Sequence, residues 1–172
     1  VAPRVSVVAL PGLSTVTELD AHAAEYSPVG AVLDGGDPLK LAAVREGRAR
    51  VQDEGSQLAA LALSRARPVR AGEQWLDLCA GPGGKAALLA AEAHAASATL
   101  TANELVPARA ELVRKALAVF DPAPEVWELD GTTVGASYPQ SFDRILLDAP
   151  CTGLGALRRR PEARWRKQPS DV

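Results

Sequence analysis

The chain has 172 residues, enough for one ordinary domain or for one domain with part of a second. Hydrophobic residues make up 47% of the chain, which supports a buried core, and the net charge of −2 gives no overall signature of nucleic-acid binding. Two cysteines far apart, with no secretion signal, argue against a disulfide framework, and no apolar run approaches the roughly 20 residues that span a membrane. We therefore expect a cytoplasmic protein, a monomer, with no membrane partner. Because the chain opens with Val1 and contains no methionine, we interpret it as a piece of a longer protein.

The first 70 residues are expected to form an N-terminal segment with a helix that packs on the rest of the chain. Val5–Leu10 is predicted to be a strand, and Gly30–Pro38, which holds four glycine or proline residues, is predicted to be a loop. Asp53 can cap a helix from about Glu54 to Arg65, whose alanines and leucines imply burial on most sides. Pro68–Gly72 is the best boundary candidate, and it divides the chain into residues 1–70 and 71–172.

Strand-like and helix-like segments alternate beyond this boundary. Strands are predicted at residues 74–78, 98–102, 125–129 and 144–147, and helices at about 85–96 and from Pro107 onward. The second helix should carry Leu112, Val113 and Leu117 on one face, and the run Ile145–Leu147 should form a buried interior strand. This alternation indicates an α/β fold with a mostly parallel sheet flanked by helices.

A glycine-rich loop, Cys79–Lys85, follows the first of these strands. Glycines let the backbone approach a ligand closely, and a helix N-terminus offers unpaired N–H groups to polar or anionic atoms. A phosphate loop is excluded, because Cys79 stands where its first glycine would be and Ala86 replaces the magnesium-binding hydroxyl. A dinucleotide fingerprint, met by Gly81, Gly83 and Ala86, and a site for S-adenosylmethionine both remain open.

Acidic residues follow the next three strands. Glu104 lies about 20 residues beyond Gly83, the spacing expected of a carboxylate that holds a ribose. Asp130 could accept a hydrogen bond from an adenine amino group, or the pair Asp130-Gly131 could be only a turn. Asp148 is followed by Pro150-Cys151. Because the carboxyl ends of parallel strands share one edge of a sheet, these residues and the glycine loop would outline one ligand.

The combination resembles the RNA cytosine-5 methyltransferases of the Sun/Fmu type. The matching residues are Val51–Leu58, Asp77–Lys85, Glu104, Asp130-Gly131, Asp148–Gly155 and Arg160–Arg166. The resemblance runs from about residue 45 to the end, and it implies a Rossmann-like methyltransferase fold that is truncated at the C-terminus. It implies methyl transfer from S-adenosylmethionine to carbon 5 of cytosine in RNA, above all ribosomal RNA.

The resemblance also implies roles for single residues. The Cys151 thiol would assist release of the methylated RNA, Asp148 would contact the cytosine or the methionine end of the cofactor, and Lys85 would orient Asp148 or the base. Residues implied in cofactor binding are Cys79, Ala80, Gly81, Pro82, Gly83, Gly84, Lys85, Glu104, Asp130 and Asp148. Of these, Cys79 is interpreted as a buried small side chain.

The attacking cysteine of the family belongs to a Thr-Cys pair on a later strand, and the sequence ends at Val172 without one. We therefore expect the chain to bind cofactor and to be inactive by itself. An alternative is that Cys151 attacks the base directly.

Basic residues crowd the last part of the chain, and Arg160, Arg164 and Arg166 are predicted to bind RNA phosphates. Trp165 between them could stack on a base or anchor the segment in the core. Two rival functions remain open, a nicotinamide oxidoreductase and a non-catalytic RNA-binding module on a methyltransferase fold. Neither histidine lies near a cysteine in the sequence, and we predict no metal site.

Overall fold

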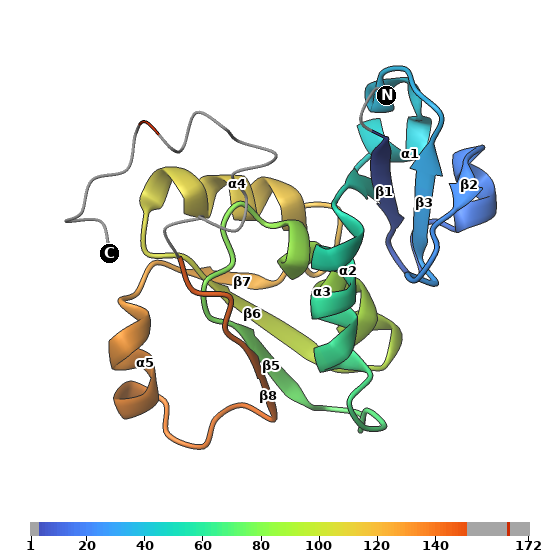
Figure 1. Cartoon of the computed structure of the whole chain (residues 1–172). Coiled ribbons are helices and arrows are strands. Elements are labelled where there is room, and N and C mark those ends of the chain that lie inside the picture. The colour runs from blue at the N-terminus through green and yellow to red at the C-terminus, as the bar shows by residue number, and fades with distance from the viewer. Residues whose placement is uncertain (1–3, 151–164, 166–172) are drawn as a thin grey trace.

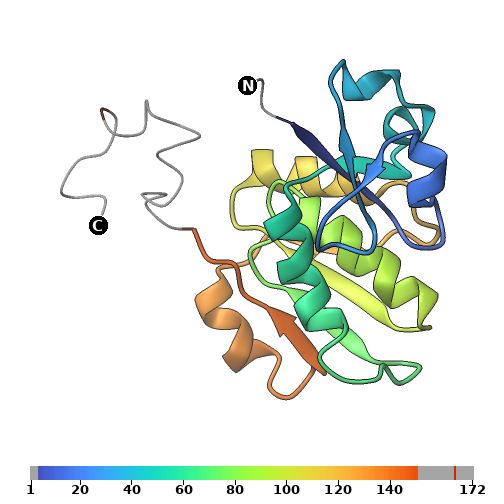
Figure 2. The same cartoon turned by 45° about the vertical axis from the view of Figure 1, so that its right-hand side comes forward.

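The structure is a computed structural model that describes residues 4–150 and residue 165. It contains two four-stranded sheets, a small antiparallel one near the N-terminus and a larger parallel one with helices beside it. Figures 1 and 2 show the small sheet lying beyond α2 and α3, on the side away from α5.

The small sheet is built by residues 5–51 in the strand order β2-β3-β1-β4. Its elements are β1 (Val5–Ala9), β2 (His22–Ala23), β3 (Gly30–Leu33) and β4 (Ala49–Val51), with the 3-10 turns η1 (Val16–Leu19) and η2 (Pro38–Lys40) and the short helix α1 (Ala42–Arg45). The predicted strand at Val5–Leu10 is thus confirmed as β1.

The prediction of a loop over Gly30–Pro38 is wrong for its first four residues, which form β3 and pair with β1. Gly30 marks a close approach here, because a Cβ on it would lie 2.6 Å from Oε1 of the buried Gln57. A glycine within a strand often marks such a close approach. From the sequence alone, however, a glycine of this kind cannot be distinguished from one in a turn.

Successive residues of β1 serve two cores, as the alternation of side chains along a strand requires. Val7 and Ala9 pack with Leu19 and Ala31 in the core of the small sheet. Val8 instead joins the main core, together with residues of α2 and α3. The small sheet is therefore packed onto the rest of the chain through one of its faces.

The larger sheet has the parallel order β7-β6-β5-β8, which confirms the predicted α/β class. Its strands are β5 (Gln74–Asp77), β6 (Thr99–Asn103), β7 (Glu125–Trp127) and β8 (Arg144–Leu146), and its helices are α2 (Glu54–Ser64), α3 (Gly84–Ala95), α4 (Pro107–Leu117) and α5 (Gly131–Ser137). In this sheet β6 and β7 extend from one side of β5, and β8 lies on its other side. The strand order therefore reverses between β5 and β8, and Rossmann-like sheets bind ligands at such a point.

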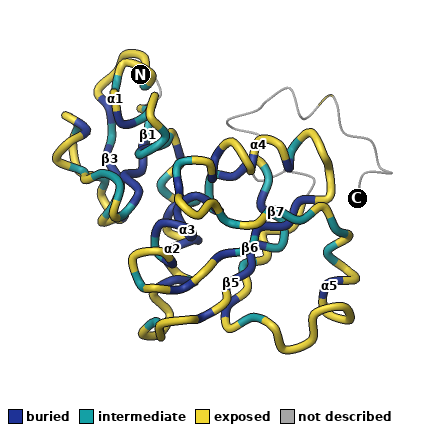
Figure 3. The backbone as a smooth tube through the Cα atoms, turned by 180° about the vertical axis from the view of Figure 1, so that it is seen from behind, coloured by how far each residue is buried: buried dark blue, intermediate teal, exposed yellow. Residues whose placement is uncertain are grey.

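The alanine-rich helix α3 lies at the centre of the main core. Seven of its twelve residues are buried, from Ala86 to Ala93, because small side chains let α2, α4 and the sheet approach it closely. The dark segments of α3 and β5 in Figure 3 follow this core. Among the described residues, no helix is both long enough and apolar enough to cross a membrane.

Three expectations about the burial of helices and strands are wrong. Helix α2 begins directly after Asp53, as predicted, but it is buried on one side only, along Gln57, Ala60, Leu61 and Ser64. Leu112 of α4 is exposed, whereas Val113 and Leu117 are buried. The run Ile145–Leu147 does not form a buried interior strand: Ile145 is 51% and Leu147 61% exposed. Within the described residues β8 pairs with β5 alone, so it lies at an edge of the sheet.

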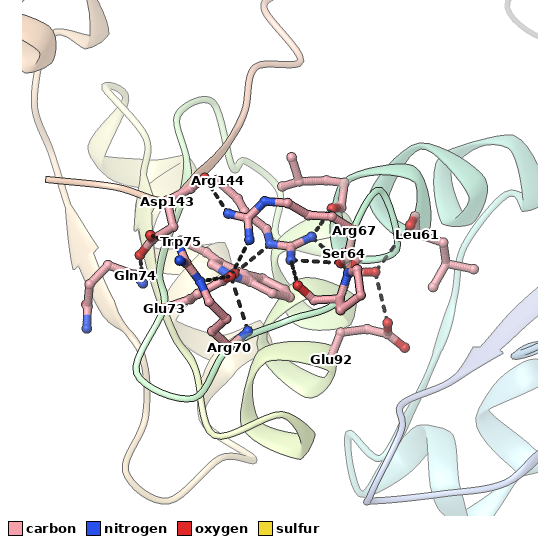
Figure 4. Close-up of polar contacts among 12 residues, drawn as sticks. Leu61, Ser64, Arg67, Arg70, Glu73, Gln74, Trp75, Glu92, Asp143 and Arg144 are labelled. Carbon is pink, nitrogen blue, oxygen red and sulfur yellow. Dashed lines mark hydrogen bonds and ion pairs between the residues drawn. The ribbon is translucent and has the colours of Figure 1, made fainter. Parts of the chain in front are cut away.

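Arg144 joins β8 to the end of α2 and to the linker that follows (Figure 4). Its Nε donates to Glu73 Oε2 at 2.7 Å, and its Nη1 donates to the carbonyls of Leu63 and Ser64 in the last turn of α2. Carbonyls at a helix C-terminus need partners from outside the helix, and the guanidinium supplies them. Arg144 also lies 5.1 Å from the ring centre of Trp75, the largest fully buried side chain.

Candidate active site

The glycine loop connects the carboxyl end of β5 to the first turn of α3, where the sequence places it. Gly83 precedes the helix with φ of 103°, a left-handed conformation that favours glycine. A Cβ on Gly83 would lie 2.6 Å from Cβ of Ala116 and 3.2 Å from Cα of Val113, both in α4. The loop thus depends on glycine here for its conformation and for its contact with α4.

We expect Gly83→Ala to lower the free energy of unfolding by about 2 to 4 kcal/mol, from the left-handed backbone and from overpacking against α4. Urea denaturation followed by circular dichroism measures this. Gly84→Ala is the matched control, because Gly84 is helical and its nearest neighbour would lie 3.8 Å away, an ordinary contact. If Gly83→Ala and Gly84→Ala lose the same unfolding free energy, the requirement for glycine at position 83 is contradicted.

Glu104 is held against the glycine loop. Its Oε2 accepts a hydrogen bond from the Gly81 N–H at 3.1 Å, and its Oε1 accepts one from the Val106 N–H at 3.0 Å. Arg109 of α4 donates to the Gly81 carbonyl at 2.7 Å and pairs with Glu104 at 3.5 Å. The predicted ribose-binding acid therefore has a fixed position beside the loop.

Asn103, which the sequence analysis did not select, ties three loops at this edge. Its Nδ2 donates to the carbonyls of Leu78 and Leu129, and its Oδ1 accepts from the Leu129 N–H at 3.0 Å. It is almost fully buried. A polar residue at the end of a strand, next to a functional acid, was the signal that could have indicated it.

Asp130 caps α5, a helix that the sequence analysis did not predict. Its Oδ1 accepts hydrogen bonds from the backbone N–H of Thr132 at 2.9 Å and from the Thr132 hydroxyl at 2.7 Å. These bonds lower the pKa of the Asp130 carboxyl. Asp130 also lines a cavity beside the glycine loop. Asp130 therefore begins a turn and at the same time lies where a ligand could reach it.

Two cavities adjoin at the glycine loop, and Cys79 lines both. One, of about 430 Å³, is mostly apolar and lies between the loops after β5, β6, β7 and β8. Its lining includes Leu78, Leu105, Leu147, Ala149 and Pro150, with Asn103, Glu104 and Asp130 at polar positions. Exposed leucines gathered around one hollow are a common feature of binding sites for flat apolar groups.

The second cavity, of about 180 Å³, is more polar and lies between β5 and β8, at the point where the strand order reverses. Gln52, Ser56, Asp77, Lys85 and Asp148 contribute to its lining. Lys85 Nζ lies 2.6 Å from Asp148 Oδ2, so these two predicted site residues form an ion pair.

Cys79 is half-buried, whereas a buried side chain was predicted. Burial raises the pKa of its thiol, and the nearby carboxylates of Asp77, Glu104 and Asp148 raise it further. Because the thiolate is the reactive form of cysteine, this environment is unsuited to a nucleophile.

The remaining predicted residues, Cys151, Arg160, Arg164 and Arg166, lie outside the described residues. Trp165 is described and is exposed. Over residues 4–150, no group of three His, Cys, Asp or Glu side chains is placed to hold a metal ion. His22 pairs with the exposed Asp34 at 2.8 Å.

Residues 66–172, well over half of the chain, match the family described as 16S rRNA methyltransferase RsmB/F. The chain is 50% identical to Mycobacterium tuberculosis Rv1407, named as a methyltransferase, over 99% of the chain and 37% of that protein. It is 36% identical to the ribosomal RNA small subunit methyltransferase B of Pseudomonas putida, over 90% of the chain and 35% of that protein. The chain thus spans little more than a third of these relatives.

Solved structures share the fold. PH0851 superposes with a TM-score of 0.80 at 24% identity, covering 96% of this chain and 39% of the other. NSun6 from Pyrococcus horikoshii, determined with SFG, superposes with a TM-score of 0.58 at 22% identity, covering 76% of this chain and 34% of the other. The family match and the Rossmann-like sheet with its glycine loop agree, and the chain belongs to the RsmB/F family of 16S rRNA methyltransferases.

Proposed function

We propose that this chain is the cofactor-binding part of an enzyme that transfers the methyl group of S-adenosylmethionine to carbon 5 of cytosine in ribosomal RNA. The observation that carries the proposal is the pair of cavities, one apolar and one polar, that meet at the glycine loop. They lie at the carboxyl ends of the parallel strands, where Rossmann-like folds bind nucleotides. The family membership supports methyl transfer over the nicotinamide alternative.

The residues present fit an adenosine in the apolar cavity. Leu105 and Leu147 would contact the adenine, and Asp130 would accept from its amino group. Each oxygen of Glu104 already accepts one backbone N–H, and a carboxylate oxygen can accept a second bond, here from a ribose hydroxyl. Residues Cys79–Lys85 would line the remainder of the cofactor. NSun6, determined with SFG, an analogue of S-adenosylmethionine, supports this choice of ligand.

When bound, S-adenosylmethionine supplies the electrophilic methyl group. The Lys85 ammonium holds the Asp148 carboxylate at the edge of the polar cavity, where we propose that Asp148 contacts the base or the cofactor. Cys151, three residues further, is proposed to assist release of the product. No Thr-Cys pair occurs in the 172 residues, so we propose that the chain binds cofactor without completing methyl transfer.

The same proposal covers the partner and the organisation of the chain. Arg160, Arg164 and Arg166, which follow Cys151 in the sequence, would bind RNA phosphates. Residues 71–172 would form the catalytic part and residues 1–70 the segment that packs on it, in a cytoplasmic enzyme.

Calorimetry on the 172-residue chain tests the cofactor. We expect S-adenosylhomocysteine to bind with a dissociation constant of about 1 to 100 μM, the ordinary range for metabolite sites, and NAD to give no measurable heat at 1 mM. Tighter binding of NAD than of S-adenosylhomocysteine would contradict the proposal.

The reaction is tested on the whole protein of which this chain is a part. Incubation with 16S rRNA and labelled S-adenosylmethionine, followed by mass spectrometry of the nucleosides, should give 5-methylcytidine. A methyl group on another base, or on another atom of cytosine, would refute the assigned chemistry.

A further inference from the structure

Asn103 is a buried amide that spends its donors on the chain itself. It is 1% exposed, it ends β6, and it lines the apolar cavity. Its Nδ2 donates to the carbonyls of Leu78 at 3.1 Å and Leu129 at 3.0 Å, and its Oδ1 accepts from the Leu129 N–H at 3.0 Å. An amide has two N–H donors, and both are used here, so Asn103 has none left for a ligand.

The Asn103 side chain continues the pairing of β6 with β7 beyond the end of β7. Asn103 is in register with Trp127, the last residue of β7. Two residues later, both the N–H and the carbonyl of Leu129 pair with the Asn103 amide, as they would with the main chain of a neighbouring strand. The position of Leu129, and of Asp130 directly after it, is therefore fixed from β6.

The same amide holds this segment to the loop after β5, through the Leu78 carbonyl. The two segments also touch, because a Cβ on Gly131 would lie 3.4 Å from Leu78 Cγ. Leu78 and Asp130 both line the apolar cavity. One buried side chain thus sets the separation of two walls of this cavity.

The position of the Asp130 carboxylate matters for the choice of base. Its Oδ1 accepts from the N–H and the hydroxyl of Thr132, whereas within residues 4–150 its Oδ2 accepts no hydrogen bond. Oδ2 can therefore accept from an amino group on a base. A hydrogen bond near 2.9 Å is lost when the two atoms move apart by about 1 Å, so selection of the base depends on what holds Asp130.

We propose that Asn103 is a positioning residue: it holds Asp130 at the place where the apolar cavity selects adenine over a base without the amino group. The inference rests on the proposed function, since it takes an adenosine as the ligand of this cavity. Asn103 acts through Leu129 and Asp130, and not by a bond of its own to the base.

The test compares two ligands that differ at one position of the base. S-Adenosylhomocysteine carries the amino group, and S-inosylhomocysteine carries an oxygen in its place. In calorimetry the original chain should prefer S-adenosylhomocysteine about tenfold or more, the effect of one hydrogen bond to a charged group. The preference should fall below about threefold in Asn103→Ala and in Asn103→Asp, whose carboxylate keeps the shape of the side chain but has no donor.

Val8→Ala is the control for a loss of stability. Val8 is fully buried in the main core, on β1, away from the lining of the cavity. Shortening it should lower the melting temperature by about 4 °C or more and leave the preference for S-adenosylhomocysteine unchanged. If Asn103 served only the fold, its variants would behave in the same way.

Hydrogen exchange tests the step through Leu129. The Leu129 N–H should exchange about tenfold faster or more in Asn103→Ala than in the original chain, and it should stay protected in Asn103→Asp, which keeps the acceptor. The Glu104 N–H, which donates to the Trp127 carbonyl at 3.0 Å, is the internal reference and should keep its protection in each variant.

A double variant tests the step through Asp130. Asp130→Asn should lower the preference by itself, because it removes the charged acceptor. Adding Asn103→Ala should then lower the preference no further, since the interaction through which Asn103 acts is already gone. A further loss would overturn the inference, because Asn103 would then act on the base by another route.

The outcomes separate the two proposals. If the original chain binds neither ligand, the proposed function and this inference are both overturned. If the chain binds S-adenosylhomocysteine without preference, if a folded Asn103 variant keeps the preference, or if neither variant folds, the inference fails while the function stands. Loss of the preference in the Asn103 variants, with the preference kept in Val8→Ala, supports the inference.

Discussion

Replacing Arg144 with leucine is expected to lower the free energy of unfolding by about 3 to 5 kcal/mol, the range for removing one partner of a buried ion pair. The side chains of Arg144 and Glu73 are 3% and 2% exposed, and their atoms meet at 2.7 Å. Four backbone carbonyls would also lose a donor, those of Leu63, Ser64, Arg67 and Pro68. Urea denaturation of the chain measures the loss.

Arg70→Leu is the matched control for Arg144→Leu. Arg70 belongs to the same cluster and lies 3.6 Å from Glu73 and 3.4 Å from Asp143, but its side chain is 74% exposed. Exposed ion pairs contribute little, so we expect a loss below about 1 kcal/mol. If both variants lose a similar amount of unfolding free energy, the buried pair of Arg144 and Glu73 does not stabilise the fold more than the exposed pairs of Arg70.

The same pair should leave a signature in the pH dependence of stability. The hydrogen bond from Arg144, helped by bonds from Trp75, Arg70 and Arg67, holds the pKa of Glu73 well below its usual range. A carboxylate whose pKa is lower in the folded chain stabilises the fold above its unfolded pKa of about 4.5, and this stabilisation is lost as the pH falls below that value. In Glu73→Gln the decline between about pH 5 and 3 should therefore be shallower.

Gly81→Ala is expected to weaken S-adenosylhomocysteine about 100-fold, or roughly 2.7 kcal/mol. A Cβ on Gly81 would overlap Oε2 of Glu104 and lie 2.9 Å from Nε of Arg109. Glu104 would have to leave the Gly81 N–H, and with it the position proposed for ribose binding. Isothermal titration calorimetry measures the change.

Gly135→Ala serves as the control for Gly81→Ala, because a Cβ on Gly135 would meet nothing within 4 Å. In the interior of α5 alanine also favours the helix, so stability should be kept or slightly raised and affinity unchanged. If the Gly81→Ala variant folds and binds S-adenosylhomocysteine with unaltered affinity, the close contact between Gly81 and Glu104 is not needed for binding.

The order of strands and helices beyond residue 70, apart from α5, could be predicted from the sequence, and so could the sheet edge at which the candidate site lies. These features follow from local periodicity and from the rule that carboxyl ends of parallel strands lie together, so Gly83, Glu104 and Asp148 could be selected from the order of residues alone. The glycine loop and residues Asp148–Cys151 resembled the Sun/Fmu type of RNA methyltransferase. The match of residues 66–172 to the RsmB/F family confirms this resemblance.

Burial and pairing were decided by the tertiary structure. Ile145 and Leu147 look like core residues, but their exposure depends on which elements cover β8. Gln52 and Asp77 line one cavity, and Glu73 pairs with Arg144, although each pair is far apart in the chain. Local sequence patterns determine which helices and strands form. The partner of a buried polar group depends instead on how elements that are distant in the sequence pack together. The surroundings of Asp77 therefore follow from the packing and not from the sequence around it.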